Sequence, residues 1–288
     1  MDIASLEAFL AIAETRSFSV AGERLHLTQP AVSKRIAVLE AQLGRRLFDR
    51  IGREVALTEA GQALLPRARR ILAELDDTRR VLGNLDAEVG GRLSLATSHH
   101  IGLHRLPPLL RAFSRSHPQA ALDLQFLDSE QAWAQVLHGR AELALTTLGP
   151  AAPPLRAVPV WDDPLEFVVA PDHPLAARGE VTLAELAAQP AVLPDANTFT
   201  HRIVADRFAA AGLAPTLRMT TNAMETLKML ASVGLAWSVL PHTMLDAQTT
   251  VLHVPGVQLS RQLGHVTHTG RTLSNAARAF MALLDRVS

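Results

Sequence analysis

The strongest constraint on the fold is a narrow apolar stripe between residues 58 and 84. Its members recur at alternating steps of three and four residues, like the a and d positions of a coiled coil: Gly61, Leu64, Ala68, Ile71, Leu75, Thr78, Leu82 and Leu85. A helix that packs only against its own chain usually carries a wider stripe. The spacing therefore predicts one long helix that pairs with a partner helix. Pro66 predicts either a bend near its start or a later beginning.

Three short helices are predicted upstream of this stripe. Leu6, Phe9, Leu10 and Ala13 repeat at helical spacing in the first helix, and Ser19 is placed to cap the second. The third helix is expected to begin at Thr28, because a capping hydroxyl is followed by a proline in the first turn. Its buried stripe is predicted to be Val32, Ile36, Leu39 and Leu43, and it should end at Gly44.

A hairpin is expected after Gly44. Residues 46–50 and 54–58 are predicted strands, joined by an exposed turn at 51–53. A helix-turn-helix followed by a basic hairpin is a winged arrangement.

Charge is unevenly distributed along the chain. The totals cancel at 28 basic and 28 acidic residues, yet between residues 24 and 53 seven basic residues oppose two acidic ones, a local excess of 7 − 2 = 5 positive charges. Affinity for nucleic acid follows local cations rather than the charge of the whole chain. This segment is therefore a candidate phosphate-binding face, with a solvated helix surface as the alternative.

The pattern of apolar residues along the chain changes after Gly90 and Gly91. Apolar runs of strand length at 93–96, 121–127, 143–146, 165–170, 191–193 and 235–240 alternate with helical segments at 103–117, 130–139, 201–211, 223–233 and 272–287. This alternation predicts a mostly parallel sheet with covered faces. A break near 150–154 and a late strand at 265–268 predict two α/β lobes, with the last helix rejoining the first lobe.

Composition excludes several classes of protein. With 48% hydrophobic and 19% charged residues the chain is globular, and without cysteine it has no disulfides, thiolate metal sites or thiol nucleophile. Neither an export signal nor a membrane span is expected, so the predicted location is the cytoplasm.

Nucleophile elbows and phosphate-binding glycine loops are missing, so no enzyme activity and no cofactor are predicted. His99, His100 and His104 lie close in sequence without a nearby carboxylate, and no metal site is predicted.

The segment from Leu6 to Thr58, with its run SFSVAGERLHLTQPAVSKRIAVLEAQLGRRLFDR, resembles the LysR-type family of bacterial transcriptional regulators. The long helix, APDHPL at 170–175 and SVGLAWSVLP at 232–241 extend the resemblance over the whole chain. It implies a homodimer or homotetramer on promoter DNA, with RNA polymerase as a candidate partner and a periplasmic-binding-protein-like domain that senses a small molecule. The expected class is α+β multidomain: a winged helix-turn-helix (1–58), a linker and dimerisation helix (59–89), effector-binding lobe I (90–162 and 265–288) and lobe II (163–264).

DNA-binding residues are predicted on the third helix and the wing. The resemblance carries over Thr28, Gln29, Pro30, Ser33 and Arg35, with Arg50 and Arg53 on the wing; Lys34 is added from its position. Amide and guanidinium groups on the exposed first turns of a helix can read base edges in a major groove.

Effector-binding residues are predicted at strand ends, because ligands of α/β sheets bind beyond the carboxyl ends of strands and near helix N-termini. Three polar loops qualify: Thr97, Ser98, His99 and His100; Thr146 and Thr147; and Asn197, Thr198, Phe199 and Thr200. Facing each other across a cleft, they would hold a small anion, although Ser and Thr at such positions also cap helices without any ligand.

Two readings of the function compete. A DNA-binding regulator with an anion-sensing bilobed domain accounts for the basic excess, the capped helix, the seam and the lobes. A cytoplasmic small-molecule-binding protein without a DNA role accounts for the lobes alone.

Overall fold

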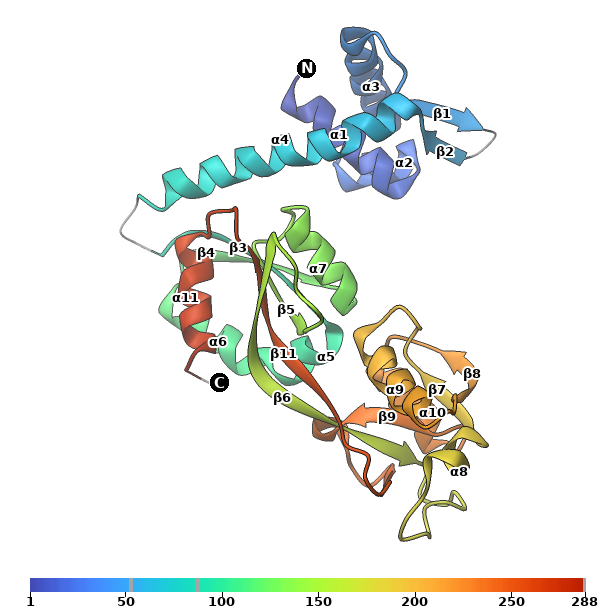
Figure 1. Ribbon diagram of the computed structural model, residues 1–288. Helices are drawn as coiled ribbons and strands as arrows, with labels where there is room; N and C mark the ends of the chain where they lie inside the picture. The colour runs from blue at the N-terminus through green and yellow to red at the C-terminus, as the bar shows by residue number, and fades with distance from the viewer. Residues whose placement is uncertain (52–53, 86–88, 287–288) are drawn as a thin grey trace. The chain divides into compact units, whose positions relative to one another are not determined.

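The computed structural model describes residues 1–51, 54–85 and 89–286, and the chain divides into two compact units, Met1–Leu82 and Gly83–Ser288. Figure 1 shows the order of the elements along the chain. Within the described residues no helix is both long enough and apolar enough to cross a membrane.

The first unit is a winged helix-turn-helix. It contains α1 (Ile3–Thr15), α2 (Phe18–Arg24), α3 (Gln29–Leu43), the antiparallel strands β1 (Phe48–Ile51) and β2 (Glu54–Leu57), and most of α4 (Glu59–Gly83). Phe9, Ile12 and Leu39 are fully buried at its centre, and the Phe9 and Phe48 rings lie 5.3 Å apart. The core therefore joins the three helices to the hairpin.

Two local predictions in this unit are wrong. Ser17, not Ser19, caps α2, because its Oγ accepts a hydrogen bond from the Val20 amide while Ser19 already lies inside the helix. Leu43 is 40% exposed, because α3 ends there and Gly44 turns the chain away with a φ of 64°. Thr28 does hold the N-cap position of α3, but its side chain makes no capping hydrogen bond.

Helix α4 is continuous through Pro66, which excludes the later beginning. Leu64 and Ala68 belong to the core of the first unit and Gly61 is buried, while Ile71 is 40% and Leu82 61% exposed. The stripe is thus partly used inside its own chain and partly left at the surface.

The second unit is built on a seven-stranded mixed sheet. The strand order is β10 (Thr250–Leu252), β6 (Leu155–Val169), β11 (Leu259–His268), β5 (Leu143–Thr147), β3 (Gly91–Thr97) and β4 (Ala120–Phe126), with β9 (Ser238–Pro241) also paired to β6. Only β3, β4 and β5 pair in parallel, so the prediction of a mostly parallel sheet is wrong. The long strands β6 and β11 pair antiparallel with each other and with their neighbours, a pattern that short apolar runs did not reveal.

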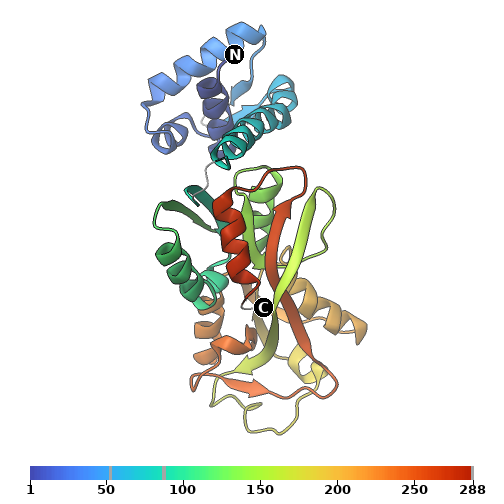
Figure 2. The ribbon, with the colours of Figure 1, turned by 90° about the vertical axis from the view of Figure 1, so that its left-hand side faces the viewer.

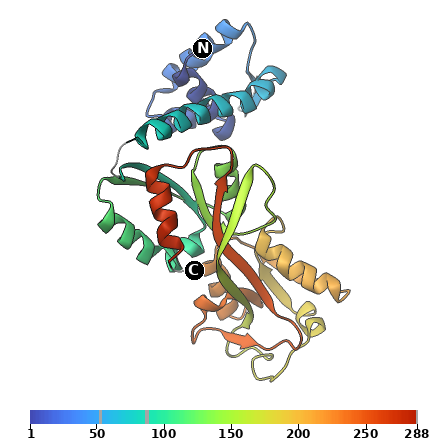
Figure 3. The ribbon, with the colours of Figure 1, turned by 60° about the vertical axis from the view of Figure 1, so that its left-hand side comes forward.

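Strands β6 and β11 run the length of this unit and connect its two α/β lobes (Figure 2). Around one end lie α5 (His99–His104), α6 (Leu106–Ser116), α7 (Ser129–Leu137) and α11 (Asn275–Leu284). Around the other lie α8 (Leu183–Ala187), α9 (Phe199–Ala210), α10 (Met224–Ser232), the short helix η1 (His242–Met244) and the parallel pair β7 (Pro190–Leu193) and β8 (Thr216–Thr220) (Figure 3). The predicted helix at 103–117 is two helices that meet at Arg105, with Pro107 and Pro108 in the first turn of the second.

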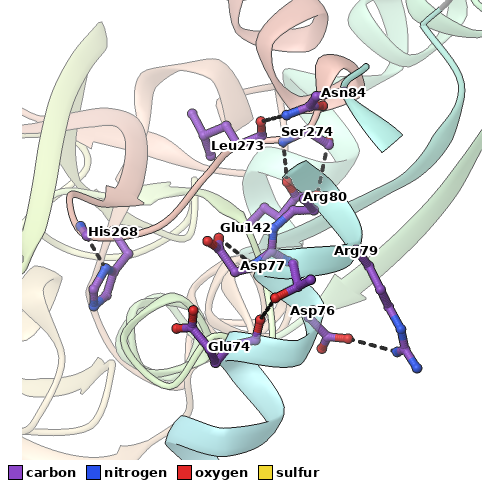
Figure 4. A network of polar contacts seen from close by, with 12 residues as sticks. Glu74, Asp76, Asp77, Arg79, Arg80, Asn84, Glu142, His268, Leu273 and Ser274 are labelled. Atoms are coloured by element: carbon purple, nitrogen blue, oxygen red, sulfur yellow. Dashed lines mark hydrogen bonds and ion pairs between the residues drawn. The ribbon is translucent and has the colours of Figure 1, made fainter. Parts of the chain in front are cut away.

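The last helix returns to the first lobe, as predicted from the late strand. Asn84 donates from Nδ2 to the Leu273 carbonyl (2.9 Å) and accepts the Asn275 amide on Oδ1 (2.7 Å). The buried carboxylate of Glu142 accepts both the amide and the hydroxyl of Ser274 (Figure 4). The start of α11 is therefore held by side chains from two distant segments of the same unit.

Candidate functional site

The first candidate site is the outer face of α3. Val32, Ile36 and Leu39 are buried on its inner face, so the residues between them point outward. Of the predicted DNA-binding residues, Thr28, Gln29, Pro30 and Lys34 are exposed, while Ser33 and Arg35 are half-buried. Within the described part of the chain neither Lys34 nor Arg35 has a carboxylate within ion-pair distance.

Two of these side chains already touch. Gln29 donates from Nε2 to the Ser33 hydroxyl at 2.8 Å, one helical turn away. An amide, a hydroxyl and two cations thus share the first two turns of one exposed helix face, which is the chemistry that reads base edges and phosphates in a major groove.

The wing is only partly described. Arg50 lies in β1 opposite Val55, and of this arginine only the backbone is described; Arg53 lies outside the described residues. Both remain predictions from the sequence.

The second candidate site is a cleft in the second unit, between the α5 and α7 loops of one lobe and the α9 and α10 loops of the other. Its walls contain Ser98, His99, His100, Leu127, Asp128, Ser129, Glu130, Thr147, Pro194, Thr198, Phe199, Thr200, Asn222, Met224 and Arg261. All three predicted loops therefore reach one cavity.

Three predicted residues do not line this cleft. Thr97 is buried and its hydroxyl donates to the Leu145 carbonyl at 2.8 Å, inside the sheet. Thr146 is also buried, and its side chain points to the face of β5 opposite to Thr147, which lines the cleft. Asn197 is exposed and is not among the residues that line the cavity.

Thr198 combines the two roles that the sequence left open. Its hydroxyl accepts the His201 amide at 3.2 Å and donates to the Asp195 carbonyl at 2.8 Å, so it caps α9. The same side chain also lines the cleft.

A charged group that the sequence analysis missed, Arg261 on β11, lies at the floor of the cleft. Its Nε donates to Asp163 Oδ2 at 2.7 Å and its Nη1 to the Thr200 hydroxyl at 2.8 Å, and both charged residues are buried. Arg105 lies 3.8 Å from the other Asp163 oxygen. The alternation Leu259, Arg261, Leu263 was the available signal, because it puts an arginine on the buried face of a strand.

His100 is the most unusual polar group of the cleft. It is 4% exposed, and neither ring nitrogen has a hydrogen-bond partner among the described residues. Burial, and then the positive charges of Arg261, His104 and Arg105, lower the pKa of its imidazole to about 3. At neutral pH the ring is therefore uncharged and offers one donor and one acceptor.

Two hydrogen bonds cross the cleft from α7 and the residue before it. Glu130 Oε1 accepts the Phe199 amide at 2.6 Å, and Asp128 Oδ2 accepts from Asn222 Nδ2 at 2.8 Å. These carboxylates were also missed, although they follow the end of β4 in the way that Ser98 follows β3. Among the described residues no three histidine or carboxylate side chains converge in a way that would hold a metal ion.

Comparison with known proteins matches both units of the chain to parts of one protein family. The model of the bacterial regulatory helix-turn-helix of the LysR family matches residues 3–62, and that of the LysR substrate binding domain matches residues 86–288. A RuBisCO operon transcriptional regulator of Allochromatium vinosum is 32% identical over 97% of this chain and 94% of its own length. An uncharacterized HTH-type regulator in an ibpB-leuC intergenic region of Azotobacter vinelandii is 78% identical, but over only 38% of this chain and 75% of its own.

A solved structure supports the same assignment. Full-length CbnR in complex with its target DNA is 25% identical, covers both chains completely and has a TM-score of 0.68. With an exposed polar helix in one unit, a polar cleft between two lobes in the other, and a family model matching each unit, this chain belongs to the LysR family of DNA-binding transcriptional regulators.

Proposed function

We propose that this regulator reads its operator through α3 and the wing, pairs with a second copy through α4, and binds a small effector with an anionic group in the cleft. Effector binding would then change promoter occupancy or the bend imposed on promoter DNA. We assign DNA binding to residues 1–58 and pairing of two chains to residues 59–89. Effector binding is assigned to the two lobes, residues 90–162 with 265–288 and residues 163–264.

The observation that carries the DNA-binding proposal is the outward position of Gln29, Ser33, Lys34 and Arg35 on a helix whose other face is buried. Had these side chains been shielded in the core, no base edge could reach them. Thr28 and Pro30 belong to the same exposed turn, and Arg50 and Arg53 on the wing are assigned to flanking phosphates.

The anionic group of the effector is assigned to the floor of the cleft. Arg261 lines the cleft, and behind it Arg105 lies 3.8 Å from the carboxylate of Asp163, so the two arginines and this one carboxylate carry a net charge of 2 − 1 = +1. Ser98, His99, His100, Thr147 and the first turn of α9 at Thr198, Phe199 and Thr200 supply hydrogen-bonding groups around it. The proposed effector contacts do not include three residues that lie outside the cleft lining, Thr97, Thr146 and Asn197.

Coupling between the two sites needs only modest energy. If the effector binds one arrangement of the lobes better than another, a difference of about 1–3 kcal/mol changes operator affinity several-fold or more. We assign the regulator to the cytoplasm, with promoter DNA, a second or further copies of itself and RNA polymerase as its partners, and assign it no enzyme activity.

The test is a salt-controlled binding titration on an operator selected from random-sequence DNA. Arg35→Ala and Ser33→Ala should each weaken binding by about 1–3 kcal/mol, because each removes a base or phosphate contact. Arg115→Ala removes an exposed cation in the second unit and serves as the control, with unchanged affinity expected. Wild-type affinity in both α3 variants would refute the assignment of α3.

A further inference from the structure

The cleft carries a negative wall opposite its positive floor. Asp128 and Glu130 both line it. Neither carboxylate belongs to an ion pair among the described residues. Asp128 accepts a hydrogen bond from the Asn222 side-chain amide and Glu130 accepts one from the Phe199 backbone N–H, and neither donor neutralises a carboxylate. A ligand that is only an anion would meet two like charges there.

The floor offers the opposite charge and an unused hydrogen-bonding group. Arg261 is held in place by Asp163 and Thr200, and Arg105 adds a second positive charge to the same carboxylate. Next to them His100, 96% buried, lines the cavity with both ring nitrogens unpartnered. A buried imidazole without hydrogen-bond partners is costly, and a ligand in the cavity could supply the missing partners.

The two charged regions lie within the length of one small molecule. Glu130 contacts the amide of Phe199, and Arg261 contacts the hydroxyl of the next residue, Thr200. Consecutive residues are about 3.8 Å apart at Cα, so the carboxylate oxygen and the guanidinium nitrogen that contact them are separated by at most about 13 Å. Both side chains also line the same cavity.

We propose that the effector is an α-amino acid, whose ammonium group is recognised by Asp128 and Glu130 and whose carboxylate is recognised by Arg261, His100 and the first turn of α9. This inference rests on the proposed function, because it takes the cleft to be the effector site, and it specifies the charge pattern of the effector. The ammonium adds favourable interactions with the negative wall that a hydroxy acid or a simple carboxylate lacks.

The closed state of the cavity indicates how such a ligand would act. Its volume is about 50 Å³, well below the roughly 300 Å³ at which ligand pockets begin. Entry therefore requires that the two hydrogen bonds across the cleft, Glu130 to Phe199 and Asp128 to Asn222, open. The ligand carboxylate then takes the Phe199 amide that Glu130 occupies, and the released Glu130 carboxylate is free to pair with the ammonium.

The experiment is isothermal titration of the full-length protein with each of the twenty standard L-amino acids. The tightest binder is then compared with the 2-hydroxy acid of the same side chain. We expect the amino acid to bind at least about tenfold more tightly, because the Coulomb attraction between two unit charges about 4 Å apart in a partly enclosed cleft exceeds the roughly 1.4 kcal/mol that a tenfold change requires.

Two conservative variants separate the ammonium contact from a merely structural role. Glu130→Gln and Asp128→Asn keep hydrogen-bond acceptors for Phe199 and Asn222 but remove the negative charge. Each substitution should weaken binding of the amino acid about tenfold. Binding of the 2-hydroxy acid should stay the same or become tighter. Glu180→Gln, on an exposed loop away from the cleft, should change neither.

The outcomes are distinct. Binding of no amino acid, or equal binding of amino acid and hydroxy acid in wild type and variants, overturns the amino-acid proposal. In that case binding of a simple organic anion that is abolished by Arg261→Met would still support the cleft as an effector site. If Arg261→Met changes the affinity of no ligand that shifts operator binding, the effector part of the proposed function fails as well.

Discussion

Residue 61 has no space for a side chain. A Cβ built on Gly61 would lie 2.2 Å from the Leu47 carbonyl oxygen, because α4 crosses the chain directly after α3 at this point. Gly61→Ala should therefore lower the free energy of unfolding of the DNA-binding unit by about 1–3 kcal/mol, through the backbone shift that the methyl group forces.

Gly83→Ala is the matched control for this substitution. Gly83 is the last residue of the same helix and a Cβ there meets nothing within 4 Å. Denaturant unfolding followed by circular dichroism should show it as neutral or slightly stabilising. Equal stability of the two variants would contradict the close approach at Gly61.

His100 should make the second unit less stable in acid. Its folded pKa is about 3, while its ordinary value is 6.5, so below pH 6.5 the unfolded chain takes up a proton that the folded chain does not bind until about pH 3. Stability is thus complete above pH 6.5 and declines as the pH falls towards 3. Between pH 7 and pH 5 the contribution is about 2 kcal/mol.

The measurement is urea unfolding at a series of pH values. His100→Gln should flatten the decline, whereas His253→Gln, at an exposed position, should leave it as in the wild type. His265 is also buried, and its pKa is lowered by burial, so part of the decline should persist in His100→Gln. An identical pH dependence in wild type and His100→Gln would show that the ring is charged in the folded protein.

At the scale of single residues, the sequence predicted which loops reach the cleft better than it predicted which side chains contact each other there. Ser98, His100, Thr147 and Thr198 were predicted because each follows or ends a strand, and all four line the cleft. Their binding to an effector stays a prediction. Arg261 was missed, since it lies inside a strand and reaches the cleft only because β11 crosses from one lobe to the other.

At the scale of elements, α4 carries the proposal that two chains pair. Ile71 and Leu82 are 40% and 61% exposed along the part of the stripe that does not join the core of the first unit, and the neighbouring Val81 is 46% exposed. Leu82→Glu should shift the dimer towards monomer by placing a charge in the paired surface.

Gln62→Glu adds the same charge on the opposite face of α4, since twenty residues at about 100° each place residue 62 about 160° from residue 82. It should leave the association unchanged. Sedimentation equilibrium at micromolar concentration measures both variants. A Leu82→Glu protein that associates as the wild type does would rule out this face of α4.

The element boundaries show where periodicity is informative. α3, α4 and the first helix were predicted within a few residues, because a long amphipathic pattern averages over many positions. Only the last third of β6 was predicted, because residues 155–164 mix polar, proline and apolar side chains and owe their strand conformation to pairing with β11. The same pairing turned an expected parallel sheet into a mixed one.

At the scale of the whole molecule, effector binding and DNA binding should be separable. Ser98 holds the N-cap position of α5, but its side chain makes no capping hydrogen bond, so Ser98→Ala removes a hydroxyl of the cleft and leaves the helix start intact. Operator affinity without effector should stay at the wild-type value. In the wild type, adding the tightest-binding ligand of the calorimetric series changes the free energy of operator binding. In Ser98→Ala this change should be less than half as large.

Operator titrations with and without that ligand test this prediction. Thr198→Ala is less suitable, because the same hydroxyl caps α9 and its loss costs about 1 kcal/mol of stability. If Ser98→Ala lowers operator affinity in both conditions, the damage lies in the fold and the proposed independence of the two sites is contradicted.

The sequence by itself determined the winged unit, the long helix, the two-lobed sensing unit and which face of α3 is polar, because periodicity, capping and turn chemistry act between residues close together in the chain. Only the tertiary structure decided which side chains share the cleft. Arg261, Asp163 and Thr200 come from three distant segments, and Glu130 meets Phe199 across 69 residues. Such contacts depend on how strands cross and pair, and burial then sets the charge of His100, which no local pattern records.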